Sequence, residues 1–326
     1  MAHLLRRFGT ALALLWLVCT LTFLLVHAAP GDAALLLLPP EADAATLTRL
    51  RSELGLDAPL ARQYAHWIGN IARGDLGTSP SSGRPVLESI REALPVSLGL
   101  GAASLLLTVL IGVAVGSAQA RRAGTLLDTG LTIVSTTLYS APTFWLSLAA
   151  VAAVTVGAAA LGVPPAWRLP AFALRDPGVL DAAAAPLDVA RHAVLPVLVL
   201  AITGAAGVAR FARSAVIEAS RGDARRTALA KGVTPDRAWY HHVVRIALPS
   251  VAALVALAVP GIVAGSVFVE GVFAWPGMGK LLLTAVSQRD HPVILAVTLL
   301  YASTVIATNL LTDMVLPRLD PRRGDG

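Results

Sequence analysis

Residues 94–122 read LPVSLGLGAASLLLTVLIGVAVGSAQARR, and this stretch decides the class of fold. No charged residue interrupts it from Leu94 to Ala120, and it ends at the basic pair Arg121-Arg122. A helix needs about 20 apolar residues to cross the hydrocarbon core of a bilayer, so the stretch is long enough to span a membrane. Basic residues collect at the cytoplasmic ends of such helices, so the pair predicts a cytoplasmic end.

The overall composition also indicates lipid as the solvent. The 326 residues are 56% hydrophobic and 14% charged, whereas soluble domains carry roughly 25% charged residues. The single cysteine, Cys19, excludes an internal disulfide and a cysteine metal cluster. Aromatic residues make up only 5% of the chain, which argues against a stacking surface for nucleic acid despite the net charge of +6.

Five further stretches have a similar length and hydropathy. The six predicted spans are Phe8–His27, Leu94–Ala120, Leu131–Val156, His192–Ala212, Ala247–Val269 and Pro292–Leu316. We therefore expect an all-α integral membrane protein with about six transmembrane helices.

The spans divide the chain into four parts. We expect a first transmembrane helix in residues 1–29 and a small extracytoplasmic segment in residues 30–93, which is polar and rich in turn signals. Residues 94–316 form the membrane core with helices two to six and a cytoplasmic loop at 214–248. Residues 317–326 form a cytoplasmic tail.

The distribution of Lys and Arg predicts the orientation. With the N-terminus in the cytoplasm, the cytoplasmic segments are net positive and the outer segments are net negative. This bias predicts that both termini are cytoplasmic. A cleaved secretory signal is the alternative for the first span, but its apolar run is longer than a usual signal core, and its removal would leave an odd number of spans.

The longest cytoplasmic loop carries the pattern most informative about function. Residues 218–235 read EASRGDARRTALAKGVTP. Arg225–Lys231 are good helix formers, Gly232 is a natural helix stop, and Thr234-Pro235 can begin the next helix. Small residues that allow another surface to approach closely stand at Thr227, Ala228 and Ala230. The pattern predicts a short helix, a break and a second helix that leads to Leu248-Pro249, although a loop made basic only by its location is an equally good physical reading.

This loop resembles the coupling segment of binding-protein-dependent ABC importer permeases, in the branch that carries oligopeptides, dipeptides and nickel. In that family an Ala-rich segment ending in Gly, followed later by Leu-Pro, docks in a groove of the ATPase subunit. This chain departs from the general permease motif in two ways. Position 226 is an arginine where the motif has an acidic residue, and the spacing from Gly232 to Leu248-Pro249 is longer than in sugar-type permeases. The peptide branch is similar in both respects. The resemblance implies an ATPase-coupling site made of Arg225, Arg226, Thr227, Ala228, Ala230, Lys231, Gly232, Leu248 and Pro249.

Other motifs similar to that branch follow in the same order over almost the whole chain. They are LGLD at 54–57, RGDLGTS at 73–79, GRPV at 83–86, VEGVFAWPGMGK at 269–280 and RDHP at 289–292. The resemblance implies a type I importer fold in a bacterial inner membrane and a subunit that forms half of a path for di- or oligopeptides. It also implies a second homologous permease, two ATPase subunits and an extracytoplasmic binding protein as partners. Nickel or another small solute is the alternative cargo.

The stretch before the last span is predicted to turn at the outer mouth of the path. Pro276, Gly277 and Gly279 do not continue the fifth helix, and Trp275 favours a membrane interface. An outer gate and a turn of purely structural use are both consistent with this pattern. Glu270 is expected to be solvated, with contact to substrate as the alternative.

Several other patterns carry no site. Gly279-Lys280 is not a phosphate loop, because Leu281 and Ala274 replace the required Ser or Thr and Gly, so no ATP site is expected in this chain. The GxxxG patterns at 112–116 and 261–265 are typical of close helix packing. We predict no cofactor and no metal site, since the adjacent His241 and His242 point about 100° apart on a helix.

Two other classes of membrane protein fit the sequence less well. An intramembrane enzyme would show a nucleophile motif or a zinc motif within the spans, and neither is present. A secondary transporter would show an internal repeat or acidic groups at mid-membrane. Asp313, near the inner end of the last span, is expected to pair with Arg318 or reach water.

Overall fold

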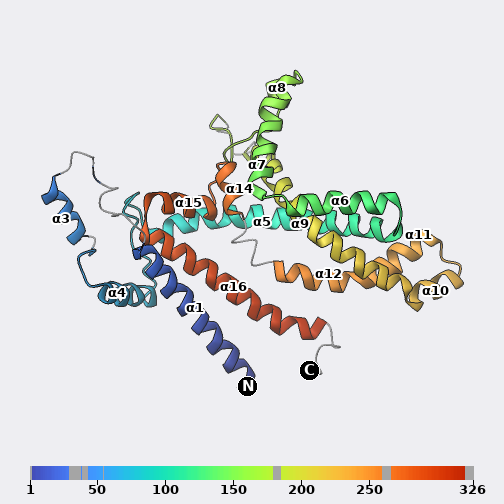
Figure 1. The fold of residues 1–326 in the computed structure, drawn as a ribbon, viewed down its shortest axis with the longest axis horizontal. Helices are drawn as coiled ribbons and strands as arrows, with labels where there is room; N and C mark the ends of the chain where they lie inside the picture. Colours follow the sequence, from blue (N-terminus) through green and yellow to red (C-terminus); the bar gives the residue numbers. More distant parts are fainter. Residues whose placement is uncertain are drawn as a thin grey trace. The chain divides into compact units, whose positions relative to one another are not determined.

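The computed structural model describes residues 2–28, 38, 43–53, 55–178, 185–258 and 266–319. All of the regular structure in these ranges is helical (Figure 1). The α-helices are α1 Ala2–Ala28, α3 Ala44–Glu53, α4 Leu60–Ala72, α5 Val86–Arg121, α6 Leu126–Ser140, α7 Thr143–Ala152, α8 Ala158–Ala160, α9 Ala185–Arg221, α10 Asp223–Ala230, α11 Pro235–Arg237, α12 Arg245–Ala258, α14 Val267–Val272, α15 Met278–Gln288 and α16 His291–Leu319. Two π-helical segments, Ala153–Gly157 and Ala238–Val244, and a short 3-10 helix, Pro165–Trp167, connect them.

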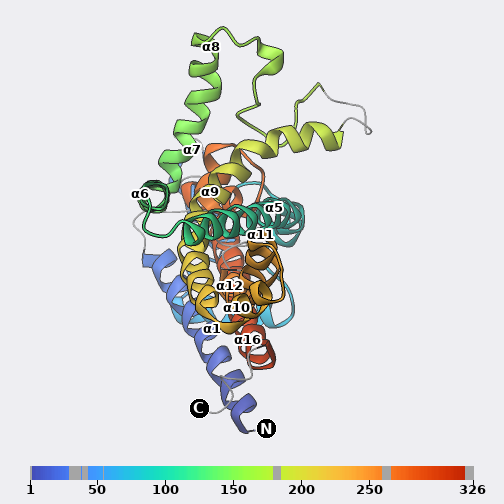
Figure 2. The same cartoon turned by 90° about the vertical axis from the view of Figure 1, so that its right-hand side faces the viewer.

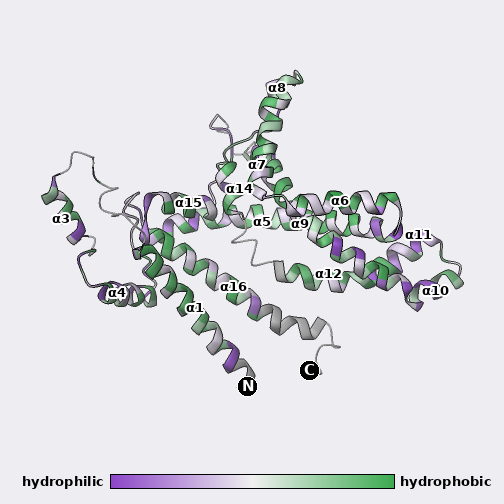
Figure 3. Ribbon diagram, in the orientation of Figure 1, coloured by the Kyte–Doolittle hydropathy of each residue, from purple (hydrophilic) through white to green (hydrophobic). Residues whose placement is uncertain are grey.

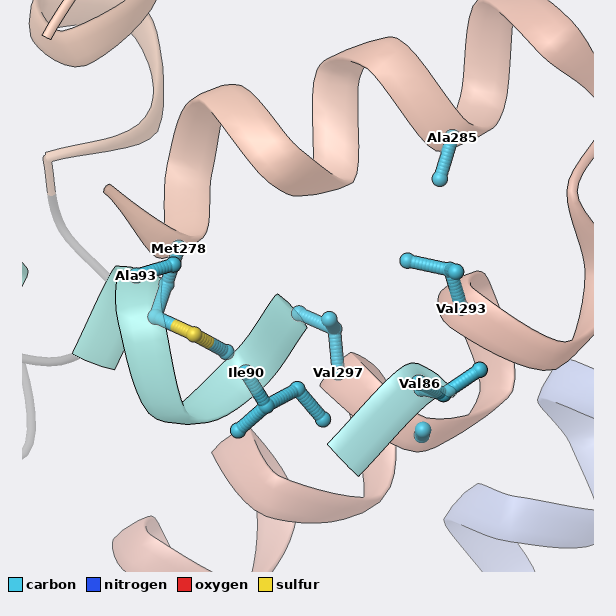
Figure 4. Close-up of a cluster of buried hydrophobic side chains, with 8 residues drawn as sticks. Val86, Ile90, Ala93, Met278, Ala285, Val293 and Val297 are labelled. Carbon is cyan, nitrogen blue, oxygen red and sulfur yellow. The ribbon is translucent and has the colours of Figure 1, made fainter. Parts of the chain in front are cut away.

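The chain forms two compact units. The first contains Met1–Ser97 and Pro276–Ala307, and its core lies where the start of α5 packs against α15 and α16 (Figure 4). Val86, Ile90 and Met278 are among the fully or almost fully buried side chains of this core. Met278 also donates its backbone N–H to Ser97 Oγ at 2.8 Å.

An aromatic cluster joins the outer segment to α1 within the same unit. The ring of Phe23 lies 5.2 Å from the ring of Tyr64 and 5.5 Å from that of Trp67, both on α4. The hydroxyl groups of Thr20 and Tyr64 are 2.6 Å apart and hydrogen-bonded. The extracytoplasmic segment that the sequence predicts is therefore held to the first helix by its second helical piece.

The second unit contains Leu98–Trp275 and Thr308–Gly326, and α9 is its central helix. This helix packs against α6, α7 and α12. Both views show the stretch from α7 to α8 extending away from α6 (Figures 1 and 2). Twelve side chains of α9 are buried, which fits a helix surrounded by others.

Two glycines allow α5 to approach α9 very closely. A Cβ atom at Gly112 would lie 2.6 Å from Val208 Cβ, and one at Gly116 would lie 2.5 Å from the carbonyl oxygen of Ala209. The GxxxG pattern at 112–116 is thus confirmed as a helix-packing motif. The second such pattern, at 261–265, lies outside the described residues.

Five helices are long and apolar enough to span a membrane: Arg6–Ala28, Val86–Arg121, Thr143–Ala160, Ala185–Arg221 and His291–Leu310. Figure 3 shows hydrophobic colour along these helices and hydrophilic colour around α10. The predicted fifth span, Ala247–Val269, includes residues 259–265, which lie outside the described residues. The side chain of Asp313 lies outside them as well.

The third span differs from its prediction. In place of one helix over Leu131–Val156, α6 ends at Ser140 and a separate helical stretch begins at Thr143. The cause is Pro142, which has no N–H to continue the ladder and forces the preceding residue out of the helical region. Ala141 accordingly has φ −72° and ψ 131°.

Candidate coupling site

The loop after α9 folds as the sequence predicts. Helix α10, Asp223–Ala230, is followed by Gly232 at φ +79°, and α11 begins at Pro235 with Thr234 as its N-terminal flanking residue. Gly232 N–H donates to the carbonyl of Leu229 at 3.0 Å, and Val233 N–H donates to that of Ala228 at 3.1 Å. These two bonds form a Schellman motif, which needs a left-handed residue at the position of Gly232.

The predicted residues of α10 form an exposed surface. Arg225, Arg226, Thr227, Ala230, Lys231 and Gly232 are all exposed, whereas Ala228 is buried against the protein. Arg226 and Asp223 form a loose ion pair at 3.7 Å, with both side chains almost fully solvated. Basic side chains and the small side chains of Thr227 and Ala230 therefore face outward together on this surface.

The chain after α10 is anchored to the end of α5. Trp239, in the π-helical segment Ala238–Val244, is 8% exposed and donates its indole N–H to Ser117 Oγ at 3.1 Å. Arg121, the last residue of α5, pairs with Asp236 in α11. Trp239 also shares a buried cluster with Ala120 and Val216. The chain that follows α10 is thus packed against the C-terminal ends of α5 and α9.

A second anchor lies eight residues before the end of α9. Arg213 donates from Nε and Nη2 to the two carboxylate oxygens of Asp128 at 2.8 and 2.7 Å. The Gly124 N–H donates to the same carboxylate at 3.0 Å. The bonds from Arg213 and then from Gly124 lower the pKa of Asp128 to about 2, so the carboxylate is ionised at neutral pH. A bidentate pair of this kind fixes α6 to α9 in one orientation.

Leu248 and Pro249 lie apart from α10 in the chain, in the first turn and a half of α12. Leu248 is 42% exposed and Pro249 is exposed, whereas the preceding Ala247 belongs to the buried cluster around Trp239. The structure thus ties the start of α12 to the cluster around Trp239 through Ala247, and leaves the side chains of Leu248 and Pro249 on the surface.

The outer stretch differs from its prediction at Glu270. This residue is fully buried in α14 and accepts a hydrogen bond from Ser266 Oγ, so the expectation of a solvated carboxylate is wrong. The reason is that α14 packs against α7 and α9, which turns this face of the helix inward. Trp275 is 3% exposed, and its backbone N–H donates to the backbone carbonyl of Glu270 at 2.8 Å.

The turn itself ends α14 at Val272 as expected. Ala274 has φ +52°, and Ala173 in the outer loop donates its N–H to the carbonyl of Phe273 at 3.0 Å. Pro276 is exposed, and Gly277 precedes α15, which contains Gly279. Helix α15 was not predicted, although the apolar residues Leu281, Leu282, Ala285 and Val286 recur at the three- and four-residue spacing of a helix.

Comparisons with known proteins settle the family. Residues 93–325 match the family described as the binding-protein-dependent transport system inner membrane component, and residues 1–101 match the family of its N-terminal region. The chain belongs to this family. It is a permease subunit of an ABC transport system and a multi-pass protein of the inner membrane.

Similar permeases are known from several bacteria. The chain is 34% identical to the oligopeptide transport system permease protein AppB of Bacillus subtilis, over 98% of both chains. It is 36% identical to the di/tripeptide transport system permease protein DppB of Pseudomonas aeruginosa, over 97% of both. A crystal structure of an amino acid ABC transporter with histidines has the same fold, with a TM-score of 0.51 at 14% identity over 71% of this chain and 94% of that one.

Proposed function

We propose that this permease forms half of the translocation path of a peptide importer and couples it to ATPase subunits through α10. The observation that carries the proposal is the exposed surface of Arg225–Gly232, ended by a left-handed glycine and anchored at Trp239. The peptide cargo follows from the relatives AppB and DppB, whose names assign them oligopeptides and di- or tripeptides.

The anchors supply a route for motion in this proposal. ATP binding brings the ATPase subunits together and displaces α10. Because α11 and the π-helical segment are fastened to α5 by Arg121–Asp236 and Trp239–Ser117, the displacement moves the inner end of α5. The Asp128–Arg213 pair carries α6 along with α9. A π-helical segment is also a frequent feature of functional sites in helices.

The proposed assembly contains this chain, a second homologous permease, two ATPase subunits and an extracytoplasmic binding protein that delivers the peptide. Both termini and the loop 214–248 face the cytoplasm. Reporter fusions at Gly83 and at Thr234 test this orientation, since three crossings separate the two points. Opposite signals are expected, and equal signals would overturn the arrangement.

The central experiment is reconstitution. The permease alone in liposomes is expected to show neither ATP hydrolysis nor peptide uptake, since its longest inner loop is far shorter than the 100–200 residues of a typical domain. Addition of the second permease and the ATPases should give ATP hydrolysis, and peptide-loaded binding protein should stimulate it. Uptake by the chain alone, driven by a proton or sodium gradient, would replace the proposal with secondary transport.

The cargo is tested on the same liposomes. Binding protein loaded with a dipeptide or an oligopeptide is expected to support uptake, and binding protein incubated with nickel chelates is not. Uptake of nickel with no uptake of peptide would move the permease to the nickel branch and leave the coupling proposal intact.

A further inference from the structure

A separate cluster of polar side chains lies where the outer loop after α8 meets the start of α9. Asp176 comes from this loop, and Asp188 and His192 come from the first two turns of α9. Each of the three side chains offers a ligand atom, and these atoms lie within 4.8 Å of one another. Asp188 and His192 share one face of the helix because they are four residues apart.

His192 presents a ring nitrogen to this cluster. Its side chain is 2% exposed, and its Nδ1 lies 2.9 Å from the carbonyl oxygen of Asp188. An acceptor at that position holds the proton on Nδ1, which leaves a lone pair on Nε2. Nε2 has no hydrogen-bond partner among the described residues and lies 3.9 Å from Asp176 Oδ1. A lone pair facing a carboxylate is repulsive, and a cation, a proton or a bridging water between them removes the repulsion.

The described residues place no Arg or Lys side chain against the two carboxylates. Within the described part of the chain, neither Asp176 nor Asp188 pairs with an Arg or Lys side chain, and Arg191 donates instead to the carbonyl of Ala166 at 3.3 Å. Asp188 is 9% exposed. Its Oδ2 accepts a hydrogen bond from the backbone N–H of Asp176 at 2.8 Å, and its Oδ1 lies 3.5 Å from His192 Nδ1. Buried negative charge is costly without a compensating cation.

We propose that Asp176, Asp188 and His192 bind a divalent metal ion of the zinc type. One imidazole nitrogen and two carboxylate oxygens are ligands that Zn²⁺ accepts, at about 2.0–2.2 Å each, so two ligands of a tetrahedral ion lie roughly 3.4 Å apart. The observed gap of 3.9 Å between Nε2 and Oδ1 closes with a small rotation of Asp176, whose side chain is 67% exposed.

The bound ion would clamp the outer loop onto α9. The same loop donates the Ala173 N–H to the carbonyl of Phe273, so the clamp also steadies the turn that follows α14. The alternative is a protonated His192 that bridges two carboxylates with no metal, and the experiment separates the two.

The test uses the purified full chain in lipid nanodiscs, stripped with a chelator and titrated with Zn²⁺. One zinc ion per chain is expected to bind. Asp176→Asn should weaken binding at least tenfold, and this exposed substitution leaves the core of the unit intact. His192→Gln should abolish binding. His241→Gln removes an exposed histidine outside the cluster and should bind zinc as the unmodified chain does.

Two further measurements do not depend on the stability of a variant. Co²⁺ bound to the unmodified chain should give the intense visible bands of a four- or five-coordinate ion, and Zn²⁺ should slow hydrogen exchange in residues 163–178. Absence of stoichiometric zinc binding by the unmodified chain would overturn the proposal, and so would unchanged affinity in Asp176→Asn. Either result would leave the cluster as an Asp-His-Asp ion pair.

Discussion

The proposed coupling segment, Arg225–Gly232, and the turn after α14, here called the outer turn, both break a helix at a residue with positive φ, yet they do so by different means. In the coupling segment the residue is Gly232, at +79°, with no atom within 4 Å of the position of a Cβ. In the outer turn it is Ala274, at +52°, and its neighbours Phe273 and Trp275 are 2% and 3% exposed. The first break is a local preference of glycine, whereas the second is imposed on an alanine by the packing around it.

The largest expected loss of stability follows from disturbing the side-chain packing that imposes the outer turn. Phe273 lies in a buried cluster with Leu195, Val199 and Val269, so Phe273→Ala should leave a cavity and cost about 3 kcal/mol. Arg226→Ala in the coupling segment should change stability by less than about 0.5 kcal/mol, because its ion pair is solvated. Thermal unfolding of both variants in detergent measures the difference. Equal losses would mean that the two regions do not differ in how they are held.

The next effect concerns the helix pair that leads to the coupling segment. Gly116→Ala places a Cβ 2.5 Å from the carbonyl oxygen of Ala209, a backbone atom that moves only with its helix, so about 2 kcal/mol should be lost. Gly99→Ala is the matched control on the same helix, since nothing lies within 4 Å of a Cβ there. Because Ala is the better helix former, the control should be neutral or stabilising. A stable Gly116→Ala variant would contradict the close approach of α5 and α9.

Sequence patterns predicted the features of this permease that depend on neighbouring residues. The break at Gly232, the helix start at Pro235 and the glycine contact on α5 all follow from conformational or steric properties of single residue types. The anchors were not predictable in the same way, because Asp128 and Arg213 are 85 residues apart and the sequence does not reveal their pairing. Burial of Glu270 was missed for the same reason, since it depends on where α14 packs.

The break at Pro142 was not predicted, although its cause lies in the local sequence. A proline stands inside the long apolar run, but the span was predicted from hydropathy alone. Hydropathy does not register that proline has no backbone N–H to continue a helix. The cluster of Asp176, Asp188 and His192 was not predicted, because Asp176 joins the pair on α9 only through the fold of the loop after α8.

A smaller effect tests the role of the glycine conformation in coupling. Gly232→Ala should cost about 1 kcal/mol through backbone strain, and peptide uptake should fall while insertion stays normal. Gly162 is the matched control, because it ends α8 at φ +70° with the same pair of hydrogen bonds and open space around it. Gly162→Ala should lose the same stability and keep full uptake in the reconstituted assembly. Equal uptake by both variants would remove the α10 turn from the coupling mechanism.

The smallest expected effect has the opposite sign and tests whether packing really strains the outer turn. Ala274→Gly relieves a left-handed alanine, a gain that the greater freedom of the unfolded glycine chain partly offsets, so a net stabilisation of about 0.5 kcal/mol is expected. Ala149, an exposed position inside α7, is the control, and Ala149→Gly should lose about 0.5–1 kcal/mol because it weakens a regular helix. Differential scanning fluorimetry in detergent should therefore place the two substitutions on opposite sides of the unmodified chain. If both lower the melting temperature equally, residue 274 does not hold a strained conformation, and the outer turn resembles the coupling segment in being set by local preference.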